Sequence, residues 1–482
     1  MKYRCKNCGY IYSYPLDDLT NCLMCNNPKK DIVEWDDKEG FIKQEKEKKR
    51  VWVNELNPSI ARIDELCIDC GMCQKTCTEM TNISYDKQIS DNPICIHCGQ
   101  CIINCPTKAL VPKYDYKQVL NYLNDTEYIV TVSIAPAVRV SIGDLFDCPP
   151  GEFLEGKLVA ALRKLKFDKV FDLTFGADVT IMEEASELVE RIKNKKNLPQ
   201  FTSCCPSWIK YCEMFHDDLL NNISTTKSPI MIQGALINSY YSEFNNLDKN
   251  KIINVMVAPC VAKKYEIKRH EHTNIDYVIT VQELVMMLKE CNIDFNTLHN
   301  EEFDSLLGKG SGAGVIFGRT GGVMEAALRT AYYLITNKKA PAELYNISSL
   351  EEIEGIKKGS IKAGEYNIRF AIVNGMSNLE KILKIKEEFD FIEVMNCPGG
   401  CIGGGGQPLL PIPQTKIYCQ KRIESLNNND KELTIRDSHD NPEIKELYST
   451  YLDFPLSKKA KELLHTEYFS KRHHLPNKKD TI

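Results

Sequence analysis

The chain has 482 residues, enough for several domains and a sizeable core, and its formal net charge of -5 gives no case for nucleic-acid binding. It has 21 cysteines, but it begins with no cationic and apolar leader and contains no apolar run long enough to span a bilayer. We therefore expect a cytoplasmic protein with no membrane partner, in which grouped cysteines are metal ligands rather than disulfides.

Residues 1–35 contain two Cys-x2-Cys pairs, formed by Cys5, Cys8, Cys22 and Cys25. Two such pairs close together predict one small metal site with four sulfur ligands. The segment resembles a short rubredoxin-like module, which implies a single bound iron. A structural zinc site is the alternative, because thiolates alone do not choose between iron and zinc. Residues 36–55 are rich in charge and are interpreted as a linker.

Residues 56–115 contain the run Cys-x2-Cys-x2-Cys-x3-Cys twice. This is the spacing of bacterial two-cluster ferredoxins, in which the fourth cysteine of each run binds the other cluster. The segment is therefore predicted to be a ferredoxin-like α+β domain with two 4Fe-4S clusters. The ligands of one cluster would be Cys67, Cys70, Cys73 and Cys105. The ligands of the other would be Cys95, Cys98, Cys101 and Cys77.

From about residue 128, short apolar runs alternate with helical stretches. Six runs are candidate strands: Ile129–Ile134, 169–173, 253–257, 277–281, 370–373 and 391–394. Several are apolar nearly throughout, as strands covered by helices on both faces should be. Residues 126–482 are therefore predicted to form an α/β domain with parallel sheets flanked by helices, including a helical segment from about residue 430. Cys260 and Cys397 fall just after two of the runs, where open α/β sheets place their ligand sites.

Three separated motifs supply cysteines to this domain. They are Phe-Thr-Ser-Cys-Cys-Pro-Ser-Trp, with Cys204 and Cys205; Ala-Pro-Cys-Val-Ala-Lys-Lys, with Cys260; and Met-Asn-Cys-Pro-Gly-Gly-Cys, with Cys397 and Cys401, which runs on to four glycines. Together they closely resemble the active-site signatures of iron-only (FeFe) hydrogenases, over nearly all of residues 126–482. The resemblance implies an H-cluster, which is a 4Fe-4S cluster joined to a two-iron subsite with carbonyl, cyanide and azadithiolate ligands. Its ligands would be Cys205, Cys260, Cys397 and Cys401, with Cys401 as the bridge.

The resemblance also implies which other residues meet the H-cluster. Lys263 matches the lysine that binds one cyanide, and the loop with Pro136 and Ala137 matches the segment whose backbone faces the second. Ala258 and Met395 would lie beside the cofactor as well. Two positions depart from many family members: Ala258 replaces a methionine and Ile230 replaces a glutamine. These departures bear on catalytic bias, potential and gas tolerance, and they leave the ligands intact.

A proton path is the second feature that the resemblance implies. The thiol that matches Cys204 passes protons to the bridgehead amine in the family. Within residues 180–192, apolar side chains form one helical stripe and Glu184, Glu187 and Arg191 form another. With Ser224, these three match the family's relay in order. The alternative is an ordinary exposed helix face, with a Glu187–Arg191 pair contributing a few tenths of a kcal/mol.

These features predict a ferredoxin-dependent FeFe hydrogenase, an oxidoreductase that catalyses 2 H+ + 2 e− ⇌ H2. Electrons would arrive from ferredoxin or a similar carrier, and maturation proteins would supply the H-cluster. We expect no direct nicotinamide or flavin site, because the glycine-rich run 308–314 lacks the preceding strand that a dinucleotide loop needs. One alternative is a hydrogen or redox sensor of the same family, which Cys204 and the lack of an apparent signalling domain oppose. The other is a non-catalytic iron–sulfur assembly factor, which Cys204, Lys263, Glu184 and Glu187 oppose.

Overall fold

The computed structural model describes residues 2–5, 11–12, 21, 29, 32–35, 50–83, 94–269, 274–347, 350–352, 355–410 and 412–474. At the start of the chain, β1 (Lys2–Cys5) pairs in antiparallel fashion with β2 (Ile11–Tyr12) and β3 (Ile32–Trp35). Cys8, Cys22 and Cys25 lie outside the described residues, and so does the side chain of Cys5. The metal site in residues 1–35 therefore remains a prediction, as does most of the linker.

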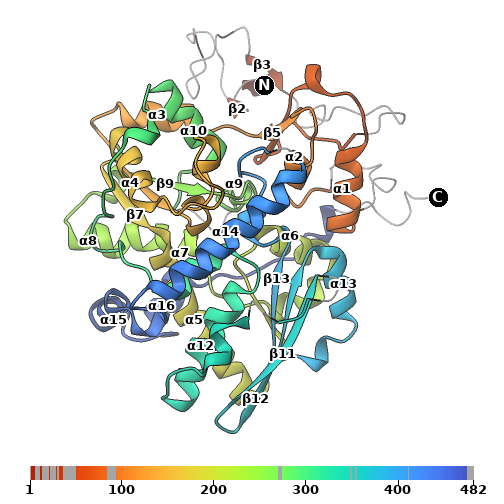
Figure 1. Cartoon of the computed structure of the whole chain (residues 1–482), viewed down its shortest axis with the longest axis vertical. Helices are drawn as coiled ribbons and strands as arrows, with labels where there is room; N and C mark the ends of the chain where they lie inside the picture. Colours follow the sequence, from red (N-terminus) through yellow and green to blue (C-terminus); the bar gives the residue numbers. More distant parts are fainter. Residues whose placement is uncertain are drawn as a thin grey trace.

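A short antiparallel pair of strands ties together the two ends of the segment with the cysteine repeat. These strands are β4 (Ile60–Arg62) and β5 (Leu110–Pro112) (Figure 1). The helix α1 (Met72–Thr81) carries Cys73 and Cys77, and α2 (Gln100–Ile103) carries Cys101. Val51 is buried, and its backbone N–H donates to Sγ of Cys73 at 3.2 Å. Residues 50–55, assigned to the linker from sequence, thus pack against this part of the molecule.

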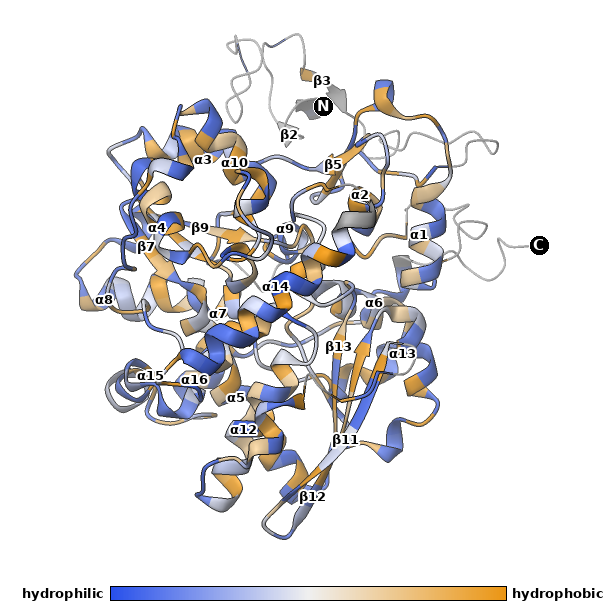
Figure 2. Ribbon diagram, in the orientation of Figure 1, coloured by the Kyte–Doolittle hydropathy of each residue, from blue (hydrophilic) through white to orange (hydrophobic). Residues whose placement is uncertain are grey.

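The first sheet of the α/β part is fully parallel, with the order β10-β9-β6-β7. Its strands are β6 (Ile129–Ile134), β7 (Lys169–Asp172), β9 (Ile252–Ala258) and β10 (Tyr277–Thr280). In Figure 2, β9 is mainly hydrophobic, as expected for a strand that is buried on both faces. Two predicted strands end one residue early because Asp172 and Thr280 cap helices whose first residues are Leu173 and Val281.

Helices cover both faces of this sheet. On one side its apolar residues share a core with α3 (Tyr116–Leu123), α4 (Glu155–Lys164) and α10 (Val281–Glu290). On the other, Phe171 and Ile252 pack with residues of α5 (Leu173–Asn194) and α7 (Pro229–Leu236). Helix α5 continues toward the second sheet, so it belongs to both layers of the core.

The second sheet has the order β11-β12-β13-β8 and is mixed rather than parallel. Its strands are β8 (Gln200–Phe201), β11 (Ile356–Ala363), β12 (Tyr366–Asn374) and β13 (Phe391–Met395). β11 and β12 form an antiparallel hairpin, which corrects the expectation of parallel sheets alone. The search for apolar runs missed β11 because its residues alternate between partly buried and exposed positions, and it missed β8 because two residues make no run. The parallel α/β character of the remainder is confirmed.

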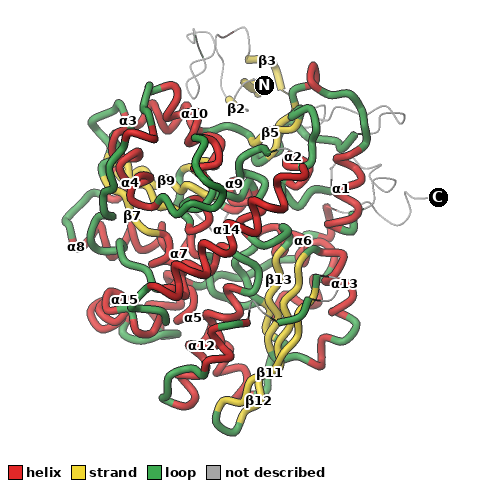
Figure 3. The backbone as a smooth tube through the Cα atoms, viewed as in Figure 1, coloured by secondary structure: helices red, strands yellow, loops and turns green. Residues whose placement is uncertain are grey.

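Side chains of the second sheet alternate between two helical layers, as the period of two requires. Ile368, Phe370 and Ile372 pack with α5 and α12 (Gly322–Thr336). Ala371 and Val373 pack on the opposite side with α6 (Pro206–Phe215) and α13 (Met376–Leu383). Figure 3 shows α12 and α13 on opposite sides of these strands.

The remaining helices close the molecule around the two sheets. They are α8 (Ser242–Phe244), α9 (Ala262–Glu266), α11 (Gly312–Val315), α14 (Ile412–Glu432), α15 (Pro442–Leu447) and α16 (Lys458–Leu464). The long helix α14 crosses the face seen in Figure 1, and α15 and α16 follow it in the helical C-terminal region. Among the helices that are described, none has the length and apolar character needed to cross a membrane.

Candidate active site

Four parallel strands of the two sheets end at one buried cavity. β6 leads to Pro136 and Ala137, β8 to Cys204 and Cys205, β9 to Cys260, and β13 to Cys397. The lining of the cavity includes Pro136, Ala137, Cys204, Cys205, Ile230, Ala258, Cys260, Lys263, Met395, Cys397 and Cys401. The structure therefore brings together every residue that was expected to meet the H-cluster, at the carboxyl ends of strands where α/β folds place ligands.

The four candidate ligand thiols are held in a setting that favours metal binding. Burial, followed by the charge of the neighbouring cysteines, raises the pKa of Cys260 to about 11 and that of Cys401 to about 12. The pKa of Cys397 is raised for the same reasons. Four thiols in one apolar cavity lose their protons only when a bound metal compensates the charge. This donor set fits an iron–sulfur cluster.

Helix starts direct backbone amides at two of these sulfurs. Cys205 precedes α6, which begins with Pro206, and amides of the first turn of α6 oppose the rise in the Cys205 pKa caused by burial. Cys260 receives backbone amides from the start of α9 in the same way. A thiolate is the species that both arrangements favour.

Two polar side chains face the cavity beside the thiols. Asn396 is fully buried, and neither its side-chain nitrogen nor its oxygen has a partner among the described residues. Lys263 donates from Nζ to the carbonyl oxygen of Cys204 at 3.0 Å and pairs with Glu266 at 2.8 Å. Burial opposes the charge on Lys263, but Glu266, Cys260 and Cys204 together outweigh it, so the Lys263 pKa is raised. Both residues fit a cofactor with polar, negatively charged ligands.

The glycine run after Cys401 permits close contact between the cavity and the cysteine repeat. A Cβ at Gly405 would lie 2.6 Å from Cα of Gly99, so these two backbones touch only because neither residue has a side chain. The side chain of Gln100 donates to the carbonyl oxygen of Gly403 at 2.8 Å. Cys98 lies near enough to Cys397 for its charge to help raise the Cys397 pKa.

The cysteines of the repeat lie close to one another. One small pocket is lined by Cys67, Cys70, Cys73 and Cys105. Burial and then the charges of Cys98, Cys95, Cys77 and Cys73 raise the pKa of Cys101. The pocket holds the four cysteines of the first predicted ligand set, and the division of the eight cysteines between two clusters remains a prediction.

The acidic stripe of α5 is buried, which contradicts the interpretation of an ordinary exposed face. Glu184 is 0% exposed, and Glu187 and Arg191 are each 8% exposed. Burial, followed by the charge of Glu187, raises the pKa of Glu184 to about 8. Among the described residues neither oxygen of the Glu184 carboxyl accepts a hydrogen bond of normal geometry, although the amide of Ser203 points toward it. Near neutral pH this carboxyl therefore holds its proton.

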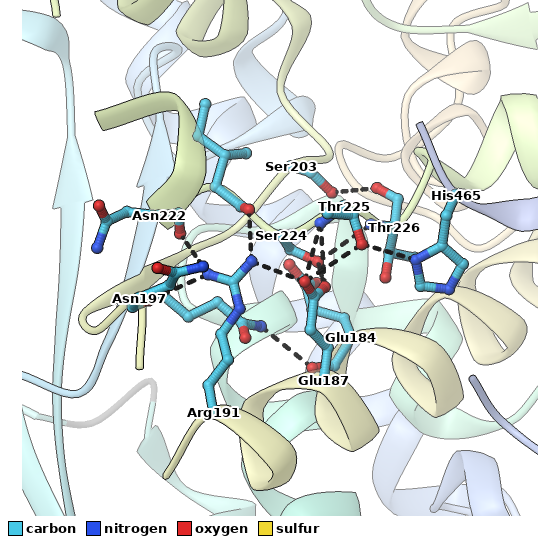
Figure 4. Close-up of polar contacts among 12 residues, drawn as sticks. Glu184, Glu187, Arg191, Asn197, Ser203, Asn222, Ser224, Thr225, Thr226 and His465 are labelled. Atoms are coloured by element: carbon cyan, nitrogen blue, oxygen red, sulfur yellow. Dashed lines mark hydrogen bonds and ion pairs between the residues drawn. The ribbon is translucent and has the colours of Figure 1, made fainter. Parts of the chain in front are cut away.

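Glu187 is held by a set of donors between Glu184 and a surface cleft (Figure 4). Ser224 Oγ donates to Glu187 Oε2 at 2.7 Å, and Arg191 Nη2 donates to Glu187 Oε1 at 2.7 Å. Carbonyl oxygens of residues 197, 222 and 223 fix the Arg191 guanidinium. Glu187 and Arg191 both line the cleft, whose volume is about 840 Å³. At the end of this stretch nearest the cavity, burial and then the charge of Glu184 raise the pKa of the Cys204 thiol.

Two residues that lie beside Glu187, namely Thr225 and His465, were not predicted from the sequence. The backbone N–H of Thr225 donates to Glu187 Oε2 at 3.0 Å, and its hydroxyl bonds to His465 Nδ1 at 2.7 Å. The polar run after Ser224 was a signal for Thr225. His465 offered none, because 240 residues separate it from its partner.

Comparison with known proteins places the chain in a family. Residues 128–405 match the family described as "Iron only hydrogenase large subunit, C-terminal domain" and residues 416–471 match "Iron hydrogenase small subunit". The chain belongs to the iron-only (FeFe) hydrogenase family.

Particular relatives show how far the similarity extends. Iron hydrogenase 1 of Clostridium pasteurianum is 41% identical over 87% of this chain and 77% of its own length. The NADP-reducing hydrogenase subunit HndD of Solidesulfovibrio fructosivorans is 39% identical over 87% of this chain and 76% of its own. The structure of an apo FeFe-hydrogenase variant from Chlamydomonas reinhardtii is 39% identical, with a TM-score of 0.65, and covers 73% of this chain and 98% of its own. A cytosolic Fe-S cluster assembly factor of Xenopus tropicalis is 29% identical over 78% of this chain and 82% of its own.

Proposed function

We propose that this chain is a catalytically active FeFe hydrogenase that interconverts protons and electrons with H2. The observation that carries the proposal is the buried acidic path that begins at Cys204, beside the four converging thiols, and ends at a surface cleft. A protein that only stores or transfers a cluster has no need of a neutral buried carboxyl such as Glu184 next to a fifth thiol.

The site is proposed to hold an H-cluster through Cys205, Cys260, Cys397 and Cys401. When bound, that cofactor supplies the redox centre at which H2 forms or splits. Lys263 and Asn396 would bind its polar ligands, and the loop of Pro136 and Ala137 would present backbone to it. Ala258, Ile230 and the other apolar residues of the lining exclude water from the cavity.

The chain's own contribution to the chemistry is the movement of protons. A general acid works best when its pKa lies near the operating pH, and burial brings Glu184 to about 8. In hydrogen production a proton taken up at the cleft would reach Glu187, pass to Glu184, and then reach the sulfur of Cys204. Ser224 and Arg191 would hold the Glu187 side chain in place between the cleft and Glu184. Hydrogen oxidation would use the same groups in reverse.

Electrons are proposed to enter through the cysteine repeat. Cys67, Cys70, Cys73 and Cys105 would hold an outer 4Fe-4S cluster, and Cys70 is exposed there to an electron carrier such as ferredoxin. Cys77, Cys95, Cys98 and Cys101 would hold an inner cluster, next to the contact between Gly99 and Gly405. The four cysteines of residues 1–35 would add a mononuclear iron, with zinc as the alternative.

The test is hydrogen production by protein that has been matured with its H-cluster and reduced with ferredoxin or methyl viologen. We expect sustained H2 release from the parent protein and little from Cys204→Ala at equal iron content. Cluster-loaded parent protein that makes no H2 and catalyses no H–D exchange would favour the assembly-factor function, which the relative at 29% identity keeps open. Slow turnover in both proteins would favour a sensor.

A further inference from the structure

The C-terminal region reaches the acidic path through one short antiparallel contact. Thr226 and His465 form an isolated β-bridge. The backbone N–H of Thr466 donates to the carbonyl oxygen of Thr225 at 2.8 Å, and that of Lys227 donates to the carbonyl oxygen of Leu464 at 2.8 Å. These bonds fix the register of the two segments, so the imidazole of His465 lies against the hydroxyl of Thr225 (Figure 4).

His465 is joined to the path by hydrogen bonds at both ring nitrogens. Its Nδ1 lies 2.7 Å from Oγ1 of Thr225, and that hydroxyl lies 3.2 Å from Oε1 of Glu187. Its Nε2 lies 3.0 Å from Oε2 of Glu183. Glu183 is fully buried and also accepts from the hydroxyl of Tyr448 at 2.5 Å and the amide of Leu456 at 2.8 Å. A fixed carboxylate on one ring nitrogen leaves the other to serve the Thr225 hydroxyl.

The surroundings of His465 connect it with solvent as well as with Glu187. The surface cleft that holds Arg191 is also lined by His465. The charged groups around this cleft and its inner wall are Glu183, Glu187, Glu190, Arg191, Lys196, Lys461 and Glu467, with Tyr448 and Tyr468 as further titratable groups. Among side chains of these kinds, histidine is the one suited to gain and lose a proton in the physiological range.

We propose that His465 is a second proton-exchange group of this path, connected to Glu187 through the Thr225 hydroxyl and positioned by Glu183. The inference rests on the proposed hydrogenase function. In the inward step, the Nδ1–H bond of the His465 imidazolium breaks and a new O–H bond forms at Thr225. The original hydroxyl proton of Thr225 moves to Oε1 of Glu187, which becomes a neutral acid while His465 becomes a neutral imidazole. His465 then regains a proton from water in the cleft.

The test uses Thr225→Val, which removes the connecting hydroxyl and keeps the side-chain shape. Thr226→Val is the matched control, because the Thr226 hydroxyl is buried and has no partner among the described residues. In matured full-length protein we expect Thr225→Val and His465→Gln each to lower H2 production about three- to tenfold, whereas Thr226→Val keeps the parental rate. Both variants should also change the pH profile of H2 production, because histidine is the side chain suited to exchange protons near neutral pH. Imidazole added to His465→Ala should restore part of the rate, because the side chain lines the cleft.

A second readout does not depend on the H-cluster. In protein without the two-iron subsite and with selectively 15N-labelled histidine, Thr225→Val should shift the Nδ1 resonance of His465 and Thr226→Val should not. Parental rates and pH profiles in both Thr225→Val and His465→Gln would overturn the inference while leaving the hydrogenase function standing. An inactive parent protein would instead reject the hydrogenase function. Equal rescue of His465→Ala by a non-basic molecule of imidazole's size would reduce His465 to a packing role and overturn the inference.

Discussion

Glu184→Gln tests the neutral buried carboxyl without reference to any cofactor. The pKa of Glu184 is about 8 in the folded protein, against the ordinary 4.5, chiefly because of burial. Between these values the folded state binds a proton that the unfolded state has lost, so the free energy of unfolding falls as pH rises. Integrated from about pH 5 to about pH 8, this dependence amounts to about 3 to 4 kcal/mol. Glutamine cannot ionise, so the unfolding free energy of the variant should lack this pH-dependent decrease.

The assay is urea unfolding of the cluster-free parent and variant at a series of pH values. The difference in unfolding free energy between the two proteins should move in favour of Glu184→Gln as pH rises, because other groups titrate equally in both. Glu190→Gln is the matched control, since Glu190 is an exposed residue of the same helix and should give no pH-dependent difference. A difference for Glu184→Gln that stays constant within about 1 kcal/mol from pH 5 to pH 8 would refute the neutral carboxyl.

The remaining predictions concern the cofactors and the N-terminal region. Cys204→Ala and Cys204→Ser should keep the iron content of the parent and lose at least about 99% of hydrogen turnover in both directions, because neither replacement offers an acid comparable to a thiol; loss of the 4Fe-4S cluster in iron analysis would instead make Cys204 a ligand. A chain that begins at Arg50 should retain hydrogen evolution with methyl viologen. A chain that begins at residue 54 lacks the backbone N–H of Val51, which donates to Sγ of Cys73, and it should lose iron from the outer cluster. Ala258→Met should shift the infrared bands of the matured protein with turnover still detectable, since residue 258 lines the cavity; unchanged spectra would show that it does not touch the cofactor.

The residues that line the cavity were predictable because short sequence motifs contain them. The spacing of the cysteines marks ligand sets directly, and apolar runs followed by Cys260 and Cys397 place those residues at strand ends. The helical stripe with Glu184 and Glu187 was also visible from its period, but periodicity says only that two faces differ. Whether the polar face meets water depends on the second sheet and on the C-terminal segment, and both lie far away in the chain.

The features that escaped prediction depend on contacts between distant residues. The strand β11 alternates between partly buried and exposed positions along its length, so no apolar run reveals it, and it forms because β12 offers an edge. Residues 50–55 look like the end of a charged linker until Val51 is seen against Cys73. His465 meets its hydrogen-bond partners through a β-bridge to residue 226, and no feature of the sequence around His465 predicts that contact.

Infrared spectroscopy of the matured protein tests the central claim most directly. Carbonyl and cyanide ligands absorb in a region where protein does not, so their bands report the two-iron subsite itself. We predict both sets of bands in the parent protein and their loss in Cys401→Ala, whose cavity lacks one of the four converging thiols. A parent protein with its 4Fe-4S clusters in place, supplied with a two-iron subsite yet showing no such bands, would contradict the assignment of this chain as a hydrogenase.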